Sequence, residues 1–162
     1  MDVKVFISHK EEDKDYAVYV QNYLHHCGIK SFLDFTDKGP NGYQSITDWI
    51  IENLRNSTHL LVIFSEHTKK SMWVPFELGV GYERNEGIGI LLNGYVANLP
   101  EYLDEFPVIK SINYLDQFIA QCRKPARYYV RDSVYGGGMR LDPNYARNFI
   151  DELKCNLKST LK

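Results

Sequence analysis

Short apolar segments recur along the chain at the spacing of strands in an α/β protein. Apolar residues alternate with other side chains over residues 3–8, and further short apolar segments follow at 29–35, 60–64, 88–92 and 107–109. Each has the length of a strand rather than of a helix. The third segment is apolar at every position, as expected of a parallel strand that is covered on both faces. The pattern therefore predicts five strands.

The segments between these strands carry apolar residues at helical spacing. This spacing extends over residues 11–26, over a helix capped near Ser45 or Gln44, over a helix from about Ser71, its expected N-cap, to Arg84, and over residues 114–123. Gly79 and Gly81 would let the third of these helices pack close to the strands. Strands that alternate with helices across short connections imply a parallel sheet wound on both faces. We predict an α/β fold with a flavodoxin-like, doubly wound, five-stranded parallel sheet.

The last part of the chain has a different pattern. Residues 124–141 lack a clear period, and the three glycines at 136–138 lack the strand before and the helix after that a phosphate-binding loop requires. We interpret them as a flexible turn. Asp142 and Pro143 then form a helix cap and first-turn pair, and apolar residues at helical spacing follow. An added C-terminal amphipathic helix is predicted here.

The size and composition of the chain fit one globular domain. It has 162 residues, of which 44% are hydrophobic and 25% charged, and this is enough to build a full core. We expect a single domain over residues 1–162. Its core covers about residues 3–124, and an extension at 125–162 packs on that core.

The charge and hydropathy of the chain exclude several partners from the prediction. The formal net charge of −2 favours neither nucleic acid nor an anionic membrane. The longest apolar run, residues 60–64, is far too short to cross a bilayer. A strand begins at residue 3, where a signal peptide would lie. We expect a cytoplasmic protein that binds neither nucleic acid nor a membrane.

The cysteine and histidine residues suggest no metal chemistry. Cys27, Cys122 and Cys155 are odd in number and widely spaced, so they predict neither a disulfide framework nor a zinc site. His25 and His26 lie at the end of a predicted helix, where histidine is favoured for electrostatic reasons. We predict no metal site and no resident cofactor.

Glu77 is the candidate for chemistry. It is a lone carboxylate in the apolar opening of a helix that directly follows the most hydrophobic strand, and burying a charge is costly unless the charge is paired or used. Trp73 precedes it by four residues, so both project from one face of the helix. A carboxylate beside an indole suits a flat cationic ring.

Four motifs, in order, resemble those of a Toll/interleukin-1 receptor (TIR) domain. They cover residues 3–92, and the resemblance fades from about residue 93. The motifs are Val5-Phe-Ile-Ser-His9 of the first strand, Gly28-Ile29 before Ser31-Phe-Leu-Asp-Phe35 of the second, the loop 36–42 at the place of the family's BB loop, and Leu60-Leu-Val-Ile-Phe-Ser65 followed by Ser71-x-Trp73-x-x-x-Glu77-x-Gly79.

The resemblance implies an activity. Trp-x-x-x-Glu is the pattern of the NAD-cleaving members, and Glu77 matches their catalytic glutamate. The chain is similar to the bacterial antiphage type of the Thoeris systems, in which a cyclic or conjugated ADP-ribose activates a separate effector. NAD glycohydrolase or ADP-ribosyl cyclase activity is thus expected, with NAD as substrate. Self-association is also expected, because the BB loop of a neighbouring subunit often completes the site in such members.

One carboxylate can suffice for this reaction. The nicotinamide of NAD already carries the positive charge that it loses on departure, so the leaving group needs no general acid, unlike the leaving oxygen in ordinary glycosidases. A single carboxylate near the anomeric carbon can stabilise the cationic transition state or trap it covalently. We expect Glu77 in this role. Residues expected at the ends of the strands or the start of the second helix would line the substrate site beside Trp73: Phe6, Ser8, Phe35, Asp37 and Ser45.

Other interpretations of the sequence stay open. Glu77 could be a surface residue that pairs with Lys69, Lys70 or Arg84. The chain could be a non-catalytic TIR scaffold that acts by assembly, or a nucleoside deoxyribosyltransferase-like enzyme, which has a related layout and uses a glutamate nucleophile. The sequence does not specify the product, the trigger or the assembly state.

Overall fold

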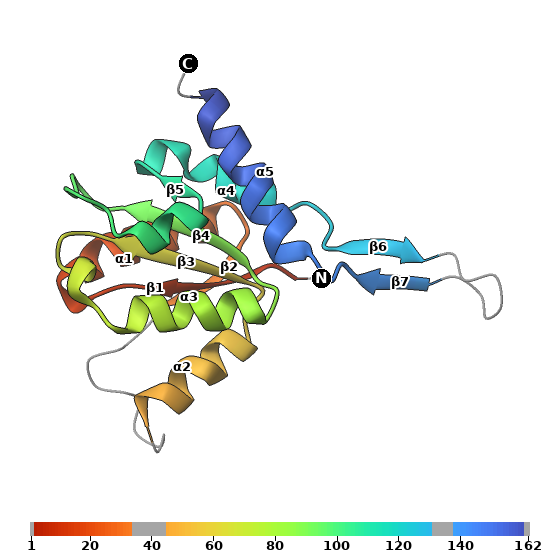
Figure 1. Ribbon diagram of the computed structural model, residues 1–162, viewed down its shortest axis with the longest axis horizontal. Coiled ribbons are helices and arrows are strands. Elements are labelled where there is room, and N and C mark those ends of the chain that lie inside the picture. Colours follow the sequence, from red (N-terminus) through yellow and green to blue (C-terminus); the bar gives the residue numbers. More distant parts are fainter. Residues whose placement is uncertain (1, 34–44, 131–137, 161–162) are drawn as a thin grey trace.

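A five-stranded parallel sheet forms the centre of the protein (Figure 1). The computed structural model describes residues 2–33, 45–130 and 138–160, and for 127–130, 138–141 and 160 it describes the backbone only. The strand order is β2-β1-β3-β4-β5, and every neighbouring pair is parallel. The strands are β1 (Lys4–Ser8), β2 (Lys30–Leu33), β3 (His59–Phe64), β4 (Gly87–Leu92) and β5 (Val108–Ile109). The predicted flavodoxin-like sheet is confirmed.

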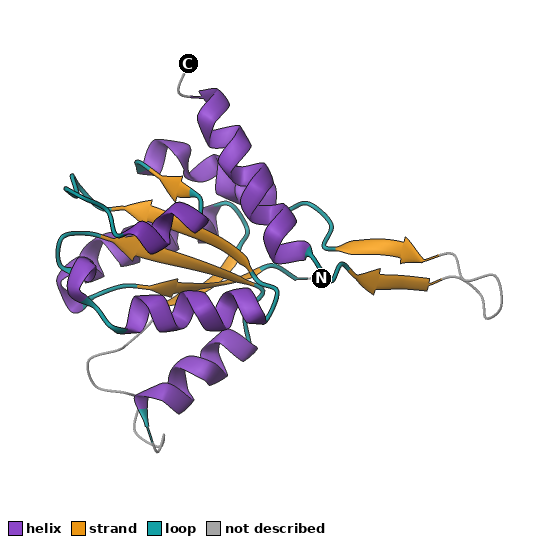
Figure 2. Cartoon of the chain, viewed as in Figure 1, coloured by secondary structure: helices purple, strands orange, loops and turns teal. Residues whose placement is uncertain are grey.

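Helices cover both faces of this sheet (Figure 2). Helices α1, α4 and α5 pack on one face, and α2 and α3 pack on the other. The helices are α1 (Lys14–His26), α2 (Ile46–Arg55), α3 (Trp73–Glu83), α4 (Leu115–Cys122) and α5 (Tyr145–Thr160). Four short 3₁₀ turns accompany them: η1 (Glu11–Asp13), η2 (Thr68–Lys70), η3 (Glu101–Glu105) and η4 (Ile112–Tyr114).

The alternation of side chains along β1 divides the core into two layers. Val5 and Ile7 point into the layer beneath α1, α4 and α5, whereas Phe6 belongs to the layer beneath α2 and α3. All residues of β3 are buried, as the sequence predicts for a strand between two helical layers. Because neighbouring strands are parallel, the carboxyl ends of β1, β3 and β4 lie at one edge of the sheet.

Helix α3 begins slightly later than its sequence predicts. Met72 occupies the N-cap position instead of Ser71, but the Ser71 hydroxyl still accepts a hydrogen bond from the Trp73 amide at 3.2 Å. Gly81 lies close to the sheet, since a Cβ there would be 3.3 Å from a methyl of Leu60. The same expectation for Gly79 is wrong, because a Cβ there would meet nothing within 4 Å.

Residues 124–141 contain two strands that the sequence analysis missed. Strands β6 (Arg127–Val130) and β7 (Gly138–Leu141) pair in antiparallel fashion and project away from the sheet (Figure 1). Gly138 pairs with Val130, so its assignment to a turn is wrong. The other two glycines of the triplet lie outside the described residues.

The predicted C-terminal helix is present as α5, and it starts at Tyr145. The Asp142 carboxylate accepts a hydrogen bond from the Asn144 amide at 2.8 Å, and the Asp142 carbonyl accepts one from the Tyr145 amide at 3.1 Å. Asp142 thus leads into the helix. Phe149, 1% exposed, anchors α5 to the sheet, with its ring 5.3 Å from that of His59 in β3 and 5.7 Å from that of Phe118 in α4. That residues 1–162 form a single domain stays a prediction.

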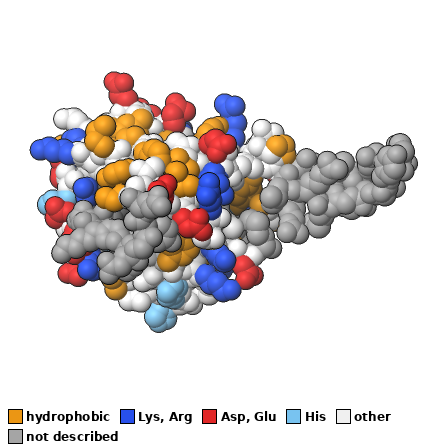
Figure 3. Space-filling model, turned by 90° about the horizontal axis from the view of Figure 1, so that it is seen from below, with side chains coloured by type: hydrophobic (Ala, Val, Ile, Leu, Met, Phe, Trp, Pro, Cys, Tyr) orange, Lys and Arg blue, Asp and Glu red, His pale blue; other side chains and the backbone are white. Residues whose placement is uncertain are grey.

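The surface mixes charges of both signs. Lys and Arg alternate with Asp and Glu across the face drawn in Figure 3, next to a group of apolar side chains. Among the described residues, no helix is both long and apolar enough to span a membrane.

Candidate active site

The structure brings Ser8 and Glu77 into contact at the carboxyl edge of the sheet. Ser8 is the last residue of β1 and is 3% exposed, and Glu77 lies in the middle of α3 and is 0% exposed. The Ser8 hydroxyl donates a hydrogen bond to Oε2 of Glu77. Ser8 faces α3 because it lies two residues after Phe6 and so points to the same side of the strand.

Packing of α3 fixes the position of the carboxylate. Val74 and Leu78, 2% and 1% exposed, lie near Glu77 on the helix and pack into the layer beneath it. Gly81, one turn later, lets the helix approach the sheet. Burial of a carboxylate is unfavourable unless hydrogen bonds compensate for the lost water, and the Ser8 hydroxyl provides one. Glu77 is therefore not a surface ion-pair residue.

Trp73 lies one turn before Glu77, as the first residue of α3. Its indole is half-buried and packs edge-to-face with the ring of Phe76, with centroids 6.1 Å apart. The indole and the carboxylate thus lie about one helical turn apart on α3. This arrangement suits an aromatic ligand next to a negative charge.

Phe6 is as fully buried as Glu77, within the apolar layer beneath α2 and α3. It is 0% exposed and packs against the rings of Phe32 and Trp49, with centroids 5.6 and 6.3 Å away. In this conformation Phe6 belongs to the core behind Ser8. Its contact with a substrate stays a prediction.

Ser45 caps α2. Its hydroxyl accepts a hydrogen bond from the Asp48 amide at 3.1 Å and donates one to the Asp48 carboxylate at 2.8 Å. In the part of the chain that the structure describes, the hydrogen bonds of Ser45 stay within this cap. Phe35 and Asp37, the remaining predicted site residues, lie outside the described residues.

Burial also restricts access to the site. With Ser8 and Glu77 almost completely shielded from solvent, a substrate cannot reach the carboxylate in the described conformation. A ligand could contact Glu77 only in a conformation in which neighbouring segments are displaced. The same burial keeps bulk water away from the carboxylate and strengthens its electrostatic effect on a bound cation.

A second buried carboxylate, that of Asp13, lies at the same edge of the sheet. The sequence did not predict its burial. Asp13 is 2% exposed and accepts hydrogen bonds from Ser65 at 2.6 Å, Thr68 at 3.1 Å and Asn93 at 2.9 Å. Three neutral donors compensate for its burial and join the start of α1 to the loops after β3 and β4. The sequence feature related to this network is the Ser-x-x-Thr spacing of Ser65 and Thr68 after β3, but the sequence does not show that both residues bind Asp13. The role of this network is structural.

The histidines form no metal site among the described residues, since no group of three or more His, Cys, Asp and Glu side chains is close enough to share an ion. The rings of His25 and His26 contact backbone carbonyls of Ser31 and Asn22 at 3.2 and 2.7 Å. His9 follows Ser8 and is 6% exposed, and its burial lowers the pKa of the imidazole.

Two further buried titratable groups lie at the opposite edge of the sheet. The ring of His59 contacts the hydroxyls of Thr58 at 2.7 Å and Tyr145 at 2.8 Å, and burial lowers the pKa of His59 to about 3. Burial raises the pKa of Glu86 to about 8, although the Arg84 guanidinium 3.5 Å away acts in the other direction. His59 links the sheet to α5 through Tyr145, and neither His59 nor Glu86 belongs to the candidate site.

Comparison with known proteins identifies the family. Residues 5–126 match the family model described as TIR domain. The chain belongs to the TIR domain family. Its similarity to the TIR domain of the Toll-related receptor TRR-2 from Hydra magnipapillata covers 93% of this chain and 97% of that one, at 18% identity and a TM-score of 0.56. No curated protein matches this chain.

A second solved structure is less similar. The TIR domains of the activated Roq1 resistosome, which directly recognises the pathogen effector XopQ, align with 56% of this chain and 58% of that one, at 24% identity and a TM-score of 0.43. TIR domains include NAD-cleaving enzymes and assembly modules. Membership of the family therefore leaves both functions open, and β6, β7 and α5 lie beyond the matched residues 5–126.

Proposed function

We propose that this TIR domain cleaves the bond between nicotinamide and ribose in NAD. The observation that supports the proposal is the buried Glu77, which accepts a hydrogen bond from Ser8 at the carboxyl edge of the sheet. Open α/β sheets bind their ligands at this edge. A carboxylate held at this edge can stabilise a cationic transition state.

Cleavage of the bond between nicotinamide and ribose requires only one charged group from the protein. As the C1′–N bond breaks, both of its electrons pass to the ring nitrogen, which neutralises the nicotinamide and leaves positive charge on the ribose. Glu77 stabilises that charge or bonds to C1′. Attack of water then gives ADP-ribose and a proton, whereas attack by a nitrogen or hydroxyl of the same molecule gives a cyclic product. We propose a cyclic or otherwise signalling ADP-ribose as the product.

The other predicted site residues have roles around this centre. Trp73 provides a ring against which nicotinamide can stack, one turn from Glu77. The N-terminus of α2 at Ser45 suits a phosphate or a ribose hydroxyl, since its amides carry partial positive charge. Phe35 and Asp37 stay predicted contacts.

The biological setting follows from the resemblance alone. We propose a cytoplasmic role in bacterial antiphage defence, in which the product activates a separate effector protein. We also propose that copies of the chain associate to complete the site. Activity should then rise with protein concentration more steeply than in direct proportion.

The test is nicotinamide release from NAD by wild type and Glu77→Gln over a range of protein concentrations. We expect the substitution to reduce release by at least about 100-fold, as loss of a group that stabilises charge in the transition state does. Glu83→Gln is the matched control, because Glu83 is exposed on the same helix. Equal release by wild type and Glu77→Gln, or none by wild type at any concentration, would contradict the proposal. Mass spectrometry of the wild-type reaction identifies the product.

The alternative enzyme class needs its own comparison. A deoxyribosyltransferase-like enzyme would accept free deoxynucleosides and exchange their bases. An excess of deoxynucleosides should leave NAD cleavage unchanged if NAD is the substrate. Strong competition by them would favour the transferase.

A further inference from the structure

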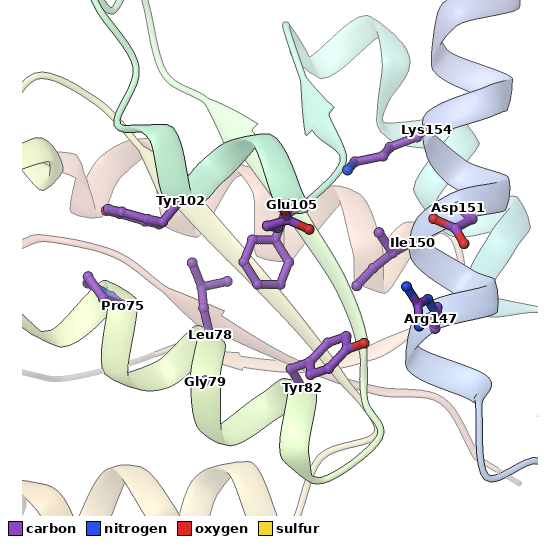
Figure 4. Close-up of a pocket in the computed structure, with 11 residues that line it drawn as sticks. Pro75, Leu78, Gly79, Tyr82, Tyr102, Glu105, Arg147, Ile150, Asp151 and Lys154 are labelled. Atoms are coloured by element: carbon purple, nitrogen blue, oxygen red, sulfur yellow. The ribbon is translucent and has the colours of Figure 1, made fainter.

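A separate cavity lies on the other side of α3, between α3, η3 and α5 (Figure 4). Its volume is about 430 Å³, within the range of about 300–1,000 Å³ usual for sites that bind small molecules. One wall of the cavity comes from residues of the matched TIR region, and the opposite wall comes from α5, which lies beyond residues 5–126. It is lined by Pro75, Leu78, Gly79, Tyr82, Tyr102, Glu105, Phe106, Arg147, Ile150, Asp151 and Lys154.

The interior of this cavity is apolar. Leu78 and Ile150, 1% and 4% exposed, contribute aliphatic surface from α3 and α5, and the ring of Phe106 adds aromatic surface. Gly79 leaves a bare strip of helix backbone between them, since a Cβ there would meet open space. Tyr82 is 45% exposed and borders the same space. A flat aromatic group fits between these surfaces.

One free cation borders the apolar space. Arg147 of α5 has no ion pair within the described ranges, and in Figure 4 the hydroxyl of Tyr82 is turned toward it. Lys154 already donates a hydrogen bond to the Asp104 carbonyl at 2.6 Å. An unpaired guanidinium next to an aromatic ring binds carboxylates well, because its two parallel N–H groups match two carboxylate oxygens.

The acidic residues limit the charge of the ligand. Glu105 and Asp151 also line the cavity. Two carboxylates in the lining repel a molecule with several negative charges, such as a nucleotide, more strongly than one with a single charge. We propose that this cavity binds a small aromatic carboxylate, with its ring over Gly79 against Phe106 and Tyr82 and its carboxylate on Arg147.

Binding can be measured with anilinonaphthalene sulfonate, a fluorescent aromatic monoanion, and its displacement by naphthoate. We expect one site per chain. Gly79→Leu should weaken naphthoate binding by about tenfold or more, because Gly79 lines the cavity and a Cβ there meets nothing within 4 Å, so the longer side chain takes up space that the ligand needs. Gly79→Ala is the matched control, since it raises helix propensity about as much as Gly79→Leu does but adds only one methyl group to the cavity.

The charge requirement is tested by pairing a ligand change with a protein change. Arg147→Gln should weaken naphthoate binding by about tenfold, the effect of one lost charged hydrogen bond, and leave neutral naphthamide unaffected. Lys158→Gln, on the same helix outside the cavity, should change neither. Adenosine monophosphate should displace the probe far less than naphthoate does. The proposal fails if naphthoate and naphthamide bind alike, if Gly79→Leu binds as wild type does, or if the nucleotide competes better.

Discussion

Removal of the Ser8 hydroxyl isolates the contact on which the proposed activity depends. In Ser8→Ala, Oε2 of Glu77 loses the hydrogen bond that it accepts at the end of β1. Both residues are buried, 3% and 0% exposed, so water cannot easily replace the donor. The substitution removes one oxygen atom and leaves the backbone of the strand unchanged.

The expected size of the effect follows from the character of this bond. A hydrogen bond to a charged group contributes about 1.5–3 kcal/mol, and the loss is at the upper end where the charge stays buried. If Ser8 holds the carboxylate in its reactive orientation, the same energy corresponds to a fall in kcat of roughly 10- to 150-fold. The Michaelis constant for NAD should change much less, because Ser8 orients Glu77 rather than providing most of the binding energy.

The assay is steady-state nicotinamide release, with the free energy of unfolding measured on the same samples by urea titration. Ser65→Ala provides the matched control. Ser65 is also a buried serine just after a strand, 4% exposed, but its hydroxyl donates to Asp13 at 2.6 Å. Because the Ser65 hydroxyl also accepts hydrogen bonds from the amides of His67 at 3.1 Å and Thr68 at 3.3 Å, Ser65→Ala should lose at least as much stability as Ser8→Ala. Only Ser8→Ala should lose kcat when rates are compared per folded molecule.

Two outcomes would refute this reasoning. Wild-type kcat in Ser8→Ala would mean that the hydrogen bond does not position the reactive carboxylate. An equal loss of kcat in Ser65→Ala would mean that the rate reports general loosening of the carboxyl edge. In either case Ser8 would have no specific role in catalysis.

Two further predictions concern stability. Phe149→Ala should lower the free energy of unfolding by about 3–5 kcal/mol, because the ring is 1% exposed, whereas Tyr95→Ala, at an 89% exposed position, should change it by less than about 0.5 kcal/mol. A small effect of Phe149→Ala, or two separate unfolding transitions, would mean that α5 does not fold with the rest of the chain. Burial raises the pKa of Glu86 from 4.5 to about 8, so the folded state holds this proton more tightly and stability should fall as pH rises between these values, with a slope of at most about 1.4 kcal/mol per pH unit. In urea titrations across this pH range, the free energy of unfolding should depend less on pH in Glu86→Gln than in wild type. An unchanged pH dependence would exclude Glu86 as its cause.

Much of the sheet could be predicted because its signals are local. An unbroken apolar run identifies β3, and helical spacing identifies α2 and its cap at Ser45. The β6–β7 ribbon was missed because its strands carry no clear apolar period. A projecting ribbon lacks the one-sided burial that creates such a period. Met72 replaced Ser71 as the cap of α3 because helix boundaries are only weakly encoded in local sequence.

The sequence by itself was enough to predict the fold class, the order of the elements and Glu77 as the candidate residue. These depend on periodicity and on the cost of a charge in an apolar helix, which are properties of neighbouring residues. Only the tertiary structure decided that Ser8, 69 residues away, donates to that carboxylate, and that Asp13 is buried among donors from two other loops. Such contacts arise because parallel strands bring their carboxyl ends to one edge, and no local pattern records which side chains meet there.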